Sequence, residues 1–129
     1  RQRQMCIRDS CKEYPTNYCI RQQINGKFSI RTYIDMPEST CIAFASRYVN
    51  EDFHSFDEYV QSSLEDFLNL HNGLFNVNMS NEQGLELQLD VPNVVTDELV
   101  TFEHEAYMLP IVYSFGTIHF IFELIHNEL

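Results

Sequence analysis

The sequence predicts an α+β fold of two layers, in which an antiparallel-rich β-sheet is covered by two helices. Three observations support this. Two alternating segments near the start are joined by Asn25-Gly26, two helical patterns follow over 37–49 and 55–75, and alternating segments return from 85 to 125. Antiparallel strands in succession with helices grouped between them are typical of one sheet covered on a face by helices. The chain contains no internal repeat.

The first two strands are predicted at 17–24 and 27–35. Asn-Gly between alternating segments is the strongest short hairpin signal, and residues 28–34 alternate apolar with polar side chains. Pro37-Glu38 then opens a helix that runs to about Val49, because proline suits the first turn and an acid suits the positive end of the helix dipole.

The longest predicted helix runs from an N-cap at Ser55, with Glu58 as its capping-box partner, to about Phe75. One face carries the apolar stripe that burial requires. That stripe comprises Phe56, Val60, Leu64, Phe67, His71, Leu74 and Phe75. A second stripe, at i, i+4, i+7 and i+11, contains Ser62, Asp66, Asn69 and Gly73. The helix is therefore expected to direct a carboxylate and a carboxamide together away from the core.

Four further strands are predicted in the second half. Residues 85–91 alternate strictly and end at Pro92, as a half-buried strand does. Segments 107–113 and 117–125 fit two strands joined by a turn, and a shorter strand fits 98–103.

The 129 residues are enough for one domain with a substantial core, and the composition is 44% hydrophobic. Residues 1–13 are polar and without periodicity, so we expect a non-native or linker-like segment there and one folded domain over 14–129. No apolar run is long enough to span a bilayer, and no signal-peptide region opens the chain. The expected location is cytoplasmic.

The net charge of −11 is unevenly distributed, because all eight Lys and Arg lie at or before Arg47 while 48–129 holds fifteen Asp and Glu. Such a surface repels phosphate backbones and argues against nucleic-acid binding. It is either a solvated acidic face or a surface for a cationic partner. The four cysteines and five histidines form no ligand motif, so we expect free thiols and no metal site. His71 is expected to be a packed core side chain.

The spacing Ser62-x3-Asp66-x2-Asn69-x22-Pro92 resembles the motif of the CheC/CheX/FliY phosphatases of bacterial chemotaxis. That motif reads Asp/Ser-x3-Glu-x2-Asn-x22-Pro, so Asp66 replaces the family Glu. Ala45-Ser46-Arg47 and Pro92-Asn93-Val94-Val95 add to the resemblance, which covers about 18–124. The chain looks closest to CheX-like members, because it carries one copy of the motif where CheC-type members commonly carry two.

The resemblance implies docking on a phosphorylated response-regulator receiver, CheY-like in kind, and hydrolysis of its aspartyl phosphate. Asn69 would orient the attacking water and Asp66 would pair with the receiver's Lys; Ser62, Glu65 and Pro92 are auxiliary candidates. No cofactor belongs to the chain itself, because the receiver supplies Mg²⁺. Since Asp is one methylene shorter than Glu, Asp66, the adjacent Glu65 or neither could serve as the acid.

Other interpretations remain open at this point. The chain could be a non-catalytic CheX-like module for interaction or dimerisation in two-component or chemotaxis signalling, or, less favoured, a flagellar switch component. CheX-like proteins dimerise through their sheets, and Ile121 and Ile125, on the less apolar strand face, leave room for a homodimer.

Overall fold

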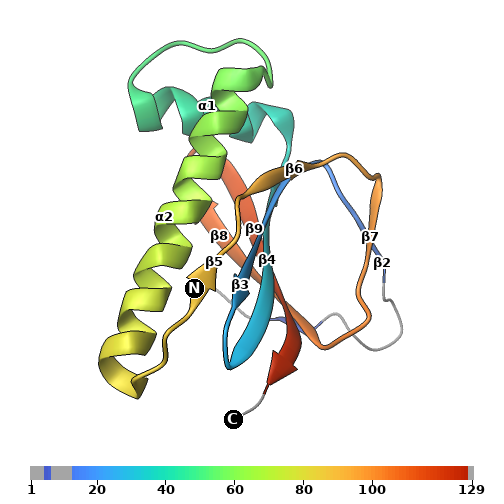
Figure 1. The fold of residues 1–129 in the computed structure, drawn as a ribbon. Helices are drawn as coiled ribbons and strands as arrows, with labels where there is room; N and C mark the ends of the chain where they lie inside the picture. The colour runs from blue at the N-terminus through green and yellow to red at the C-terminus, as the bar shows by residue number, and fades with distance from the viewer. Residues whose placement is uncertain (1–4, 7–12, 128–129) are drawn as a thin grey trace.

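The computed structural model describes residues 5–6 and 13–127. Within them it contains two helices, α1 (Glu38–Val49) and α2 (Glu58–Gln83), and nine strands. The two helices follow an N-terminal group of strands and precede a C-terminal group (Figure 1). The strands are β1 (Met5–Cys6), β2 (Glu13–Pro15), β3 (Tyr18–Asn25), β4 (Phe28–Met36), β5 (Gln88–Leu89), β6 (Asn93–Val95), β7 (Leu99–Thr101), β8 (Ala106–Tyr113) and β9 (Gly116–Asn127).

The main sheet has the strand order β1-β8-β9-β4-β3-β5, and β6 also pairs with β3. Every pairing in it is antiparallel. The two hairpins β3–β4 and β8–β9 lie next to each other through the β4–β9 pairing, which makes four long strands the centre of the sheet. The prediction of an antiparallel-rich sheet with two helices is confirmed.

The helices cover one face of the sheet, and the main core lies beneath them (Figure 1). Ile20 and Ile34 project from β3 and β4 toward Leu64 and Leu68 of α2, and all four side chains are fully buried. α1 is fixed to α2 by an edge-to-face contact between Phe44 and Phe67, with ring centroids 4.7 Å apart. Of the stripe on α2 that the sequence marked as apolar, Val60 and Leu64 are fully buried, whereas Leu74 is 67% exposed.

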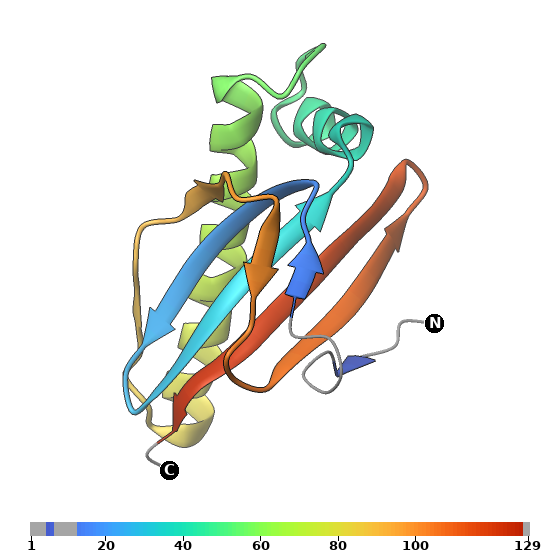
Figure 2. The ribbon, with the colours of Figure 1, turned by 90° about the vertical axis from the view of Figure 1, so that its right-hand side faces the viewer.

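A small second sheet, β2–β7, covers part of the opposite face of the main sheet (Figure 2). A second core cluster fills the space between, and it contains Tyr33, Val100, Phe102 and Ile121. Ile121 is 1% exposed, so this position of β9 is buried within its own chain. The expectation that Ile121 lies on a free face of the sheet is wrong.

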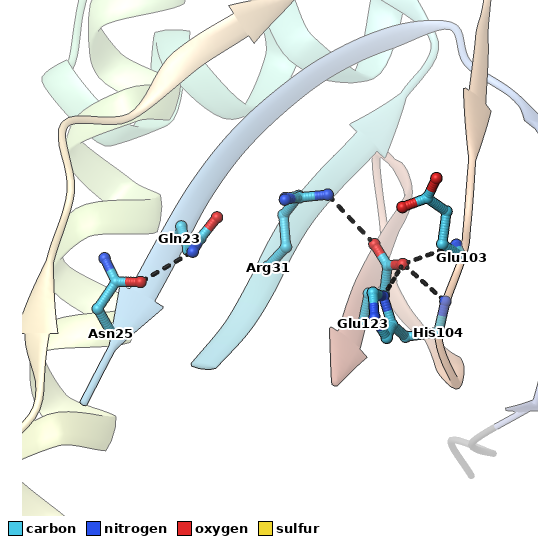
Figure 3. Close-up of polar contacts among 6 residues, drawn as sticks. All are labelled: Gln23, Asn25, Arg31, Glu103, His104 and Glu123. Atoms are coloured by element: carbon cyan, nitrogen blue, oxygen red, sulfur yellow. Dashed lines mark hydrogen bonds and ion pairs between the residues drawn. The ribbon is translucent and has the colours of Figure 1, made fainter. Parts of the chain in front are cut away.

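Glu123 is a buried carboxylate that ties the segment after β7 to the sheet (Figure 3). Its Oε2 accepts hydrogen bonds from the backbone amides of Glu103, at 3.0 Å, and His104, at 3.1 Å. Arg31 Nη1 lies 3.6 Å from Oε1, which has no hydrogen bond among the described residues. The charge is thus held mainly by two amides and is supported by one guanidinium group.

The predicted boundaries of the longest helix are wrong at both ends. The N-cap is Asp57, not Ser55, because the Asp57 carboxylate accepts bonds from the first free amides, those of Tyr59 and Val60. The helix continues beyond Phe75 to Gln83, and Gly84 ends it in the left-handed conformation. The alternating segment 85–91 forms only the two-residue strand β5, which pairs with the end of β3, while β6 pairs with the beginning of β3.

The other predicted strands and the first helix are present, with boundaries shifted by one or two residues. Of the segment 1–13, residues 1–4 and 7–12 lie outside the described residues, while Met5–Cys6 pairs with β8 and Glu13 pairs with Thr101 of β7. Among the described residues, no helix is both long and apolar enough to cross a membrane.

Candidate functional site

The polar stripe on α2 borders an open groove between this helix and the segment that follows β5. Ser62, Asp66 and Asn69 are exposed on the helix side. The other wall is formed by residues 89–92, which include Asp90 and Pro92. The structure therefore brings all five sequence-predicted site residues to one open groove of about 440 Å³; they are Ser62, Glu65, Asp66, Asn69 and Pro92.

Asp66 is fixed from the side by the other helix. Its Oδ2 accepts a hydrogen bond of 2.7 Å from the hydroxyl of Tyr48 near the end of α1. The same bond is the main cause that raises the pKa of Tyr48, because the bonded proton and the neighbouring negative charge both disfavour a phenolate. The acid is thus solvent-accessible but already engaged within its own chain.

Asn69 is fixed from below by the sheet. Its Oδ1 accepts a hydrogen bond of 2.8 Å from Nε2 of Gln22, a side chain of β3 that is only 1% exposed. Among the described residues, no group accepts a hydrogen bond from the Nδ2 of Asn69. The carboxamide therefore turns its oxygen toward the protein and keeps its N–H groups for the groove.

Glu65 lies beside this pair and is less exposed than Asp66. Burial raises the pKa of its carboxyl group, since partial removal from water disfavours the charged form. Glu65, Asp66 and Asp90 are three acids among the residues that line the groove, and the lining contains no Lys or Arg. The groove is an anionic surface with one neutral amide at its centre.

Gln22 is a functional candidate that the sequence reasoning missed. The signal was present, because the helix-facing positions of the first hairpin read Ile20, Gln22 and Ile24 on β3 and Ile30, Thr32 and Ile34 on β4. One polar residue interrupts each apolar series, and Gln22 and Thr32 are direct cross-strand neighbours. A polar pair in the middle of a buried face requires hydrogen-bond partners from the covering helix.

His71 is exposed rather than a packed core residue, so this prediction is wrong. Its ring still contacts Phe120 on β9, with the ring centroids 4.8 Å apart. The reason is that α2 packs on β3, β5 and β6, which leaves His71 at the margin of the packed helix face. Over residues 5–6 and 13–127, no three His, Cys, Asp or Glu gather in a way that could hold a metal ion.

Comparisons with known proteins agree with this architecture. Residues 18–116 match the family described as chemotaxis phosphatase CheX. Among curated proteins, no sequence matches this chain.

Three solved structures illustrate the similarity of fold. A chemotaxis protein CheX from Desulfovibrio desulfuricans superposes with a TM-score of 0.78 at 13% identity, over 97% of this chain and 83% of that one. A CheX from Vibrio vulnificus gives 0.75 at 15% identity, with the same two coverages of 97% and 83%. A CheX-CheY-BeF3-Mg²⁺ complex from Borrelia burgdorferi gives 0.70 at 17% identity, over 88% and 80%.

Because all three identities are low, the similarity to these structures shows only the fold. The family match is broader evidence, because it spans both helices and every strand from β3 to β8. The motif on α2 and the groove beside it lie within the matched region. The chain belongs to the chemotaxis phosphatase CheX family.

Proposed function

We propose that this protein docks on a phosphorylated response-regulator receiver and promotes hydrolysis of its aspartyl phosphate. The observation that carries the proposal is the joint exposure of Asp66 and Asn69, one turn apart on α2, in one open groove. Such a pair can enter the active site of another protein without rearrangement of the fold. The complex of CheX with CheY from Borrelia burgdorferi supports a CheY-like receiver as the partner.

In this mechanism the chain contributes position and charge and forms no covalent intermediate. Phosphoryl transfer depends mostly on alignment of the nucleophile and on stabilisation of charge. The receiver would supply its own Mg²⁺ and Lys. The carboxamide of Asn69 would lie beside the phosphoryl group and align the attacking water, while Asp66 would pair with the receiver's Lys. A hundredfold acceleration requires only about 2.7 kcal/mol, within reach of one well-held amide.

The charge of the groove favours a partner that presents a cation. Three of its lining residues are acids and none is basic. Exposed acids on a surface of this sign attract a Lys and repel a bare polyanion. A phosphorylated receiver offers such a Lys, and its phosphoryl group is not repelled by the groove if the receiver's own Mg²⁺ neutralises it, as the proposed mechanism requires.

The second candidate is a CheX-like module that binds a receiver without accelerating hydrolysis. The hydrogen bond between Tyr48 and Asp66 favours it, since the shorter acid is already engaged by α1. The two candidates differ in one measurable quantity, the rate of phosphate loss from the bound receiver. Binding with an unchanged rate would establish the second.

The test is the time course of phosphate loss from candidate phosphorylated receivers with and without the protein. Asn69→Ala is expected to abolish the acceleration while the thermal unfolding midpoint stays within a few degrees, because the side chain is exposed. Asn78→Ala is the matched control, an exposed asparagine on the same helix outside the groove. Equal rates for the parent and Asn69→Ala would reject the assigned role.

We also propose a homodimer that buries the apolar hollow between α2 and β9. This hollow has a volume of about 150 Å³, and Phe75, Phe120 and Phe122 are among its lining residues. Leu74 on α2 and Leu124 on β9 are exposed apolar side chains on these two elements. Sedimentation at micromolar concentration should show a dimer, and Phe120→Asp should shift it to monomer. A parent that sediments only as monomer would refute this proposal.

A further inference from the structure

Gln22 lies at the centre of a buried hydrogen-bond network that reaches Asn69 from beneath. Its Nε2 donates to Asn69 Oδ1 and to the backbone carbonyl of Asp90, both at 2.8 Å. Its Oε1 accepts from Nδ2 of Asn72, at 2.9 Å, and Asn72 is also 1% exposed. Thr32 completes the network, since its hydroxyl accepts from the same Nδ2 at 2.9 Å.

The direction of every hydrogen bond in this network is set by backbone carbonyls. The hydroxyl of Thr32 donates to the carbonyl oxygen of Gln22, so its oxygen must accept from Asn72. At the other end the Asp90 carbonyl can only accept, which places the NH₂ group of Gln22 beside it. The Asp90 backbone is itself held to β3, because its amide donates to the carbonyl of Gln23 at 3.0 Å.

The orientation of Asn69 follows from that anchor. Since the Nε2 of Gln22 faces it, Asn69 must present its oxygen to the sheet, and a flipped amide would set two donors against each other. The low dielectric around Gln22 strengthens the bonds and makes an unsatisfied alternative costly. The hydrogen bond from Gln22 therefore selects one flip state of the Asn69 amide.

We propose that Gln22 is a positioning residue for the reaction: from β3 it fixes the carboxamide of Asn69, so that both N–H groups of Asn69 point into the groove toward the phosphoryl group. The inference rests on the proposed function and adds to it the orientation of the Asn69 amide, with its oxygen toward the sheet and its N–H groups toward the groove. A side chain on an exposed helix face would otherwise sample several rotamers, and the entropy lost in ordering it would weaken binding of the receiver or slow the reaction. Gln22 makes this ordering part of the fold.

Two readouts separate this role from a purely structural one. Gln22→Met removes the donor while it keeps the length and burial of the side chain. Ile20→Val is the control, since Ile20 is a fully buried neighbour on the same strand face and bears no side-chain polar group. We expect Gln22→Met to lower kcat roughly ten- to a hundredfold with KM within about twofold, and Ile20→Val to leave both within about twofold.

The second readout needs no turnover. In the parent, the NMR order parameter of the Asn69 side-chain amide should exceed that of the exposed Asn78 amide by at least about 0.2. In Gln22→Met the two values should become equal. Equal values in the parent would overturn the proposal, and so would a Gln22→Met variant with unchanged kcat and a rigid Asn69.

This design distinguishes failure of the inference from failure of the proposed function. If the parent and Asn69→Ala release phosphate at the same rate, the proposed function fails, and the order parameters alone decide whether Gln22 holds the amide. If Asn69→Ala is inactive while Gln22→Met is fully active, the function stands and the positioning role is wrong. If Gln22→Met does not fold, the comparison of Asn69 with Asn78 in the parent decides.

Discussion

Replacement of Asp66 by Glu tests whether the acid of this site reaches its target. The added methylene extends the carboxylate by somewhat over ~1 Å, and misplacement of that order can cost about 10²-fold in rate. The change also loses or weakens the hydrogen bond from Tyr48. Because Tyr48 is 37% exposed and Asp66 is exposed, that bond contributes only about 0.5–1 kcal/mol, a factor of roughly two to five.

The gain in rate from the longer side chain therefore exceeds the loss in rate from the weaker Tyr48 hydrogen bond. If Asp66 is the acid that pairs with the receiver's Lys, Asp66→Glu should accelerate phosphate loss roughly twenty- to fiftyfold over the parent. The assay follows phosphate release from a receiver charged with a small phosphodonor, at fixed receiver and Mg²⁺ concentrations. Asp66→Asn is the matched control, since it keeps an acceptor for Tyr48 and removes only the charge; it should be slower than the parent.

Glu65→Gln separates the two candidate acids. Burial raises the pKa of Glu65, so this carboxylate is the costlier of the two to present as a charge. Its replacement should leave the rate within about twofold. A parent-like rate for Asp66→Glu together with an inactive Glu65→Gln would show that the reasoning chose the wrong acid.

Three further predictions concern the fold. Glu123→Ala should lower the free energy of unfolding by about 2–4 kcal/mol in urea titrations, because the amides of Glu103 and His104 lose a charged acceptor, and a loss under about 0.5 kcal/mol would contradict this. Burial raises the pKa of Asp35, so the folded state holds this proton more tightly than the unfolded state does. The free energy of unfolding should therefore fall as pH rises through the raised pKa. Asp35→Asn should remove this fall, and an unchanged pH profile of stability would oppose the assignment. Burial also raises the pKa of Cys41 to about 12, so mass spectrometry should find its thiol unlabelled by iodoacetamide until denaturant is added.

The fold could be predicted because its signals are local. Asn25-Gly26 sets the first hairpin, and period-two alternation marks β4, β8 and β9. The end of α2 could not be predicted, since residues 76–83 are polar and lack a buried stripe; Gly84 is the only local stop signal. The strand predicted at 98–103 is present as β7, but β2 and its pairing with β7 in an outer layer were missed, because such short strands depend on tertiary contacts rather than on periodicity.

The candidate site was predicted in part. The spacing of Asp66 and Asn69 along a helix places both on one stripe, so their shared exposure follows from helix geometry alone. The hydrogen bonds that hold these two side chains do not follow from helix geometry, because Tyr48 lies 18 residues from Asp66 and Gln22 lies 47 residues from Asn69. Such contacts exist only after α1 packs on α2 and α2 packs on β3.

The two tethers differ in strength, and this difference suggests how the site would work. Gln22 holds Asn69 through a buried network anchored at two backbone carbonyls, whereas Tyr48 holds Asp66 through one bond at the surface. An exposed bond of that kind contributes about 1 kcal/mol or less, so a receiver's Lys could replace the Tyr48 hydroxyl at little cost. The amide would therefore keep its orientation on docking while the acid adjusts to its partner. This division suits a reaction in which the water must be aligned tightly and the charged contact needs only to form.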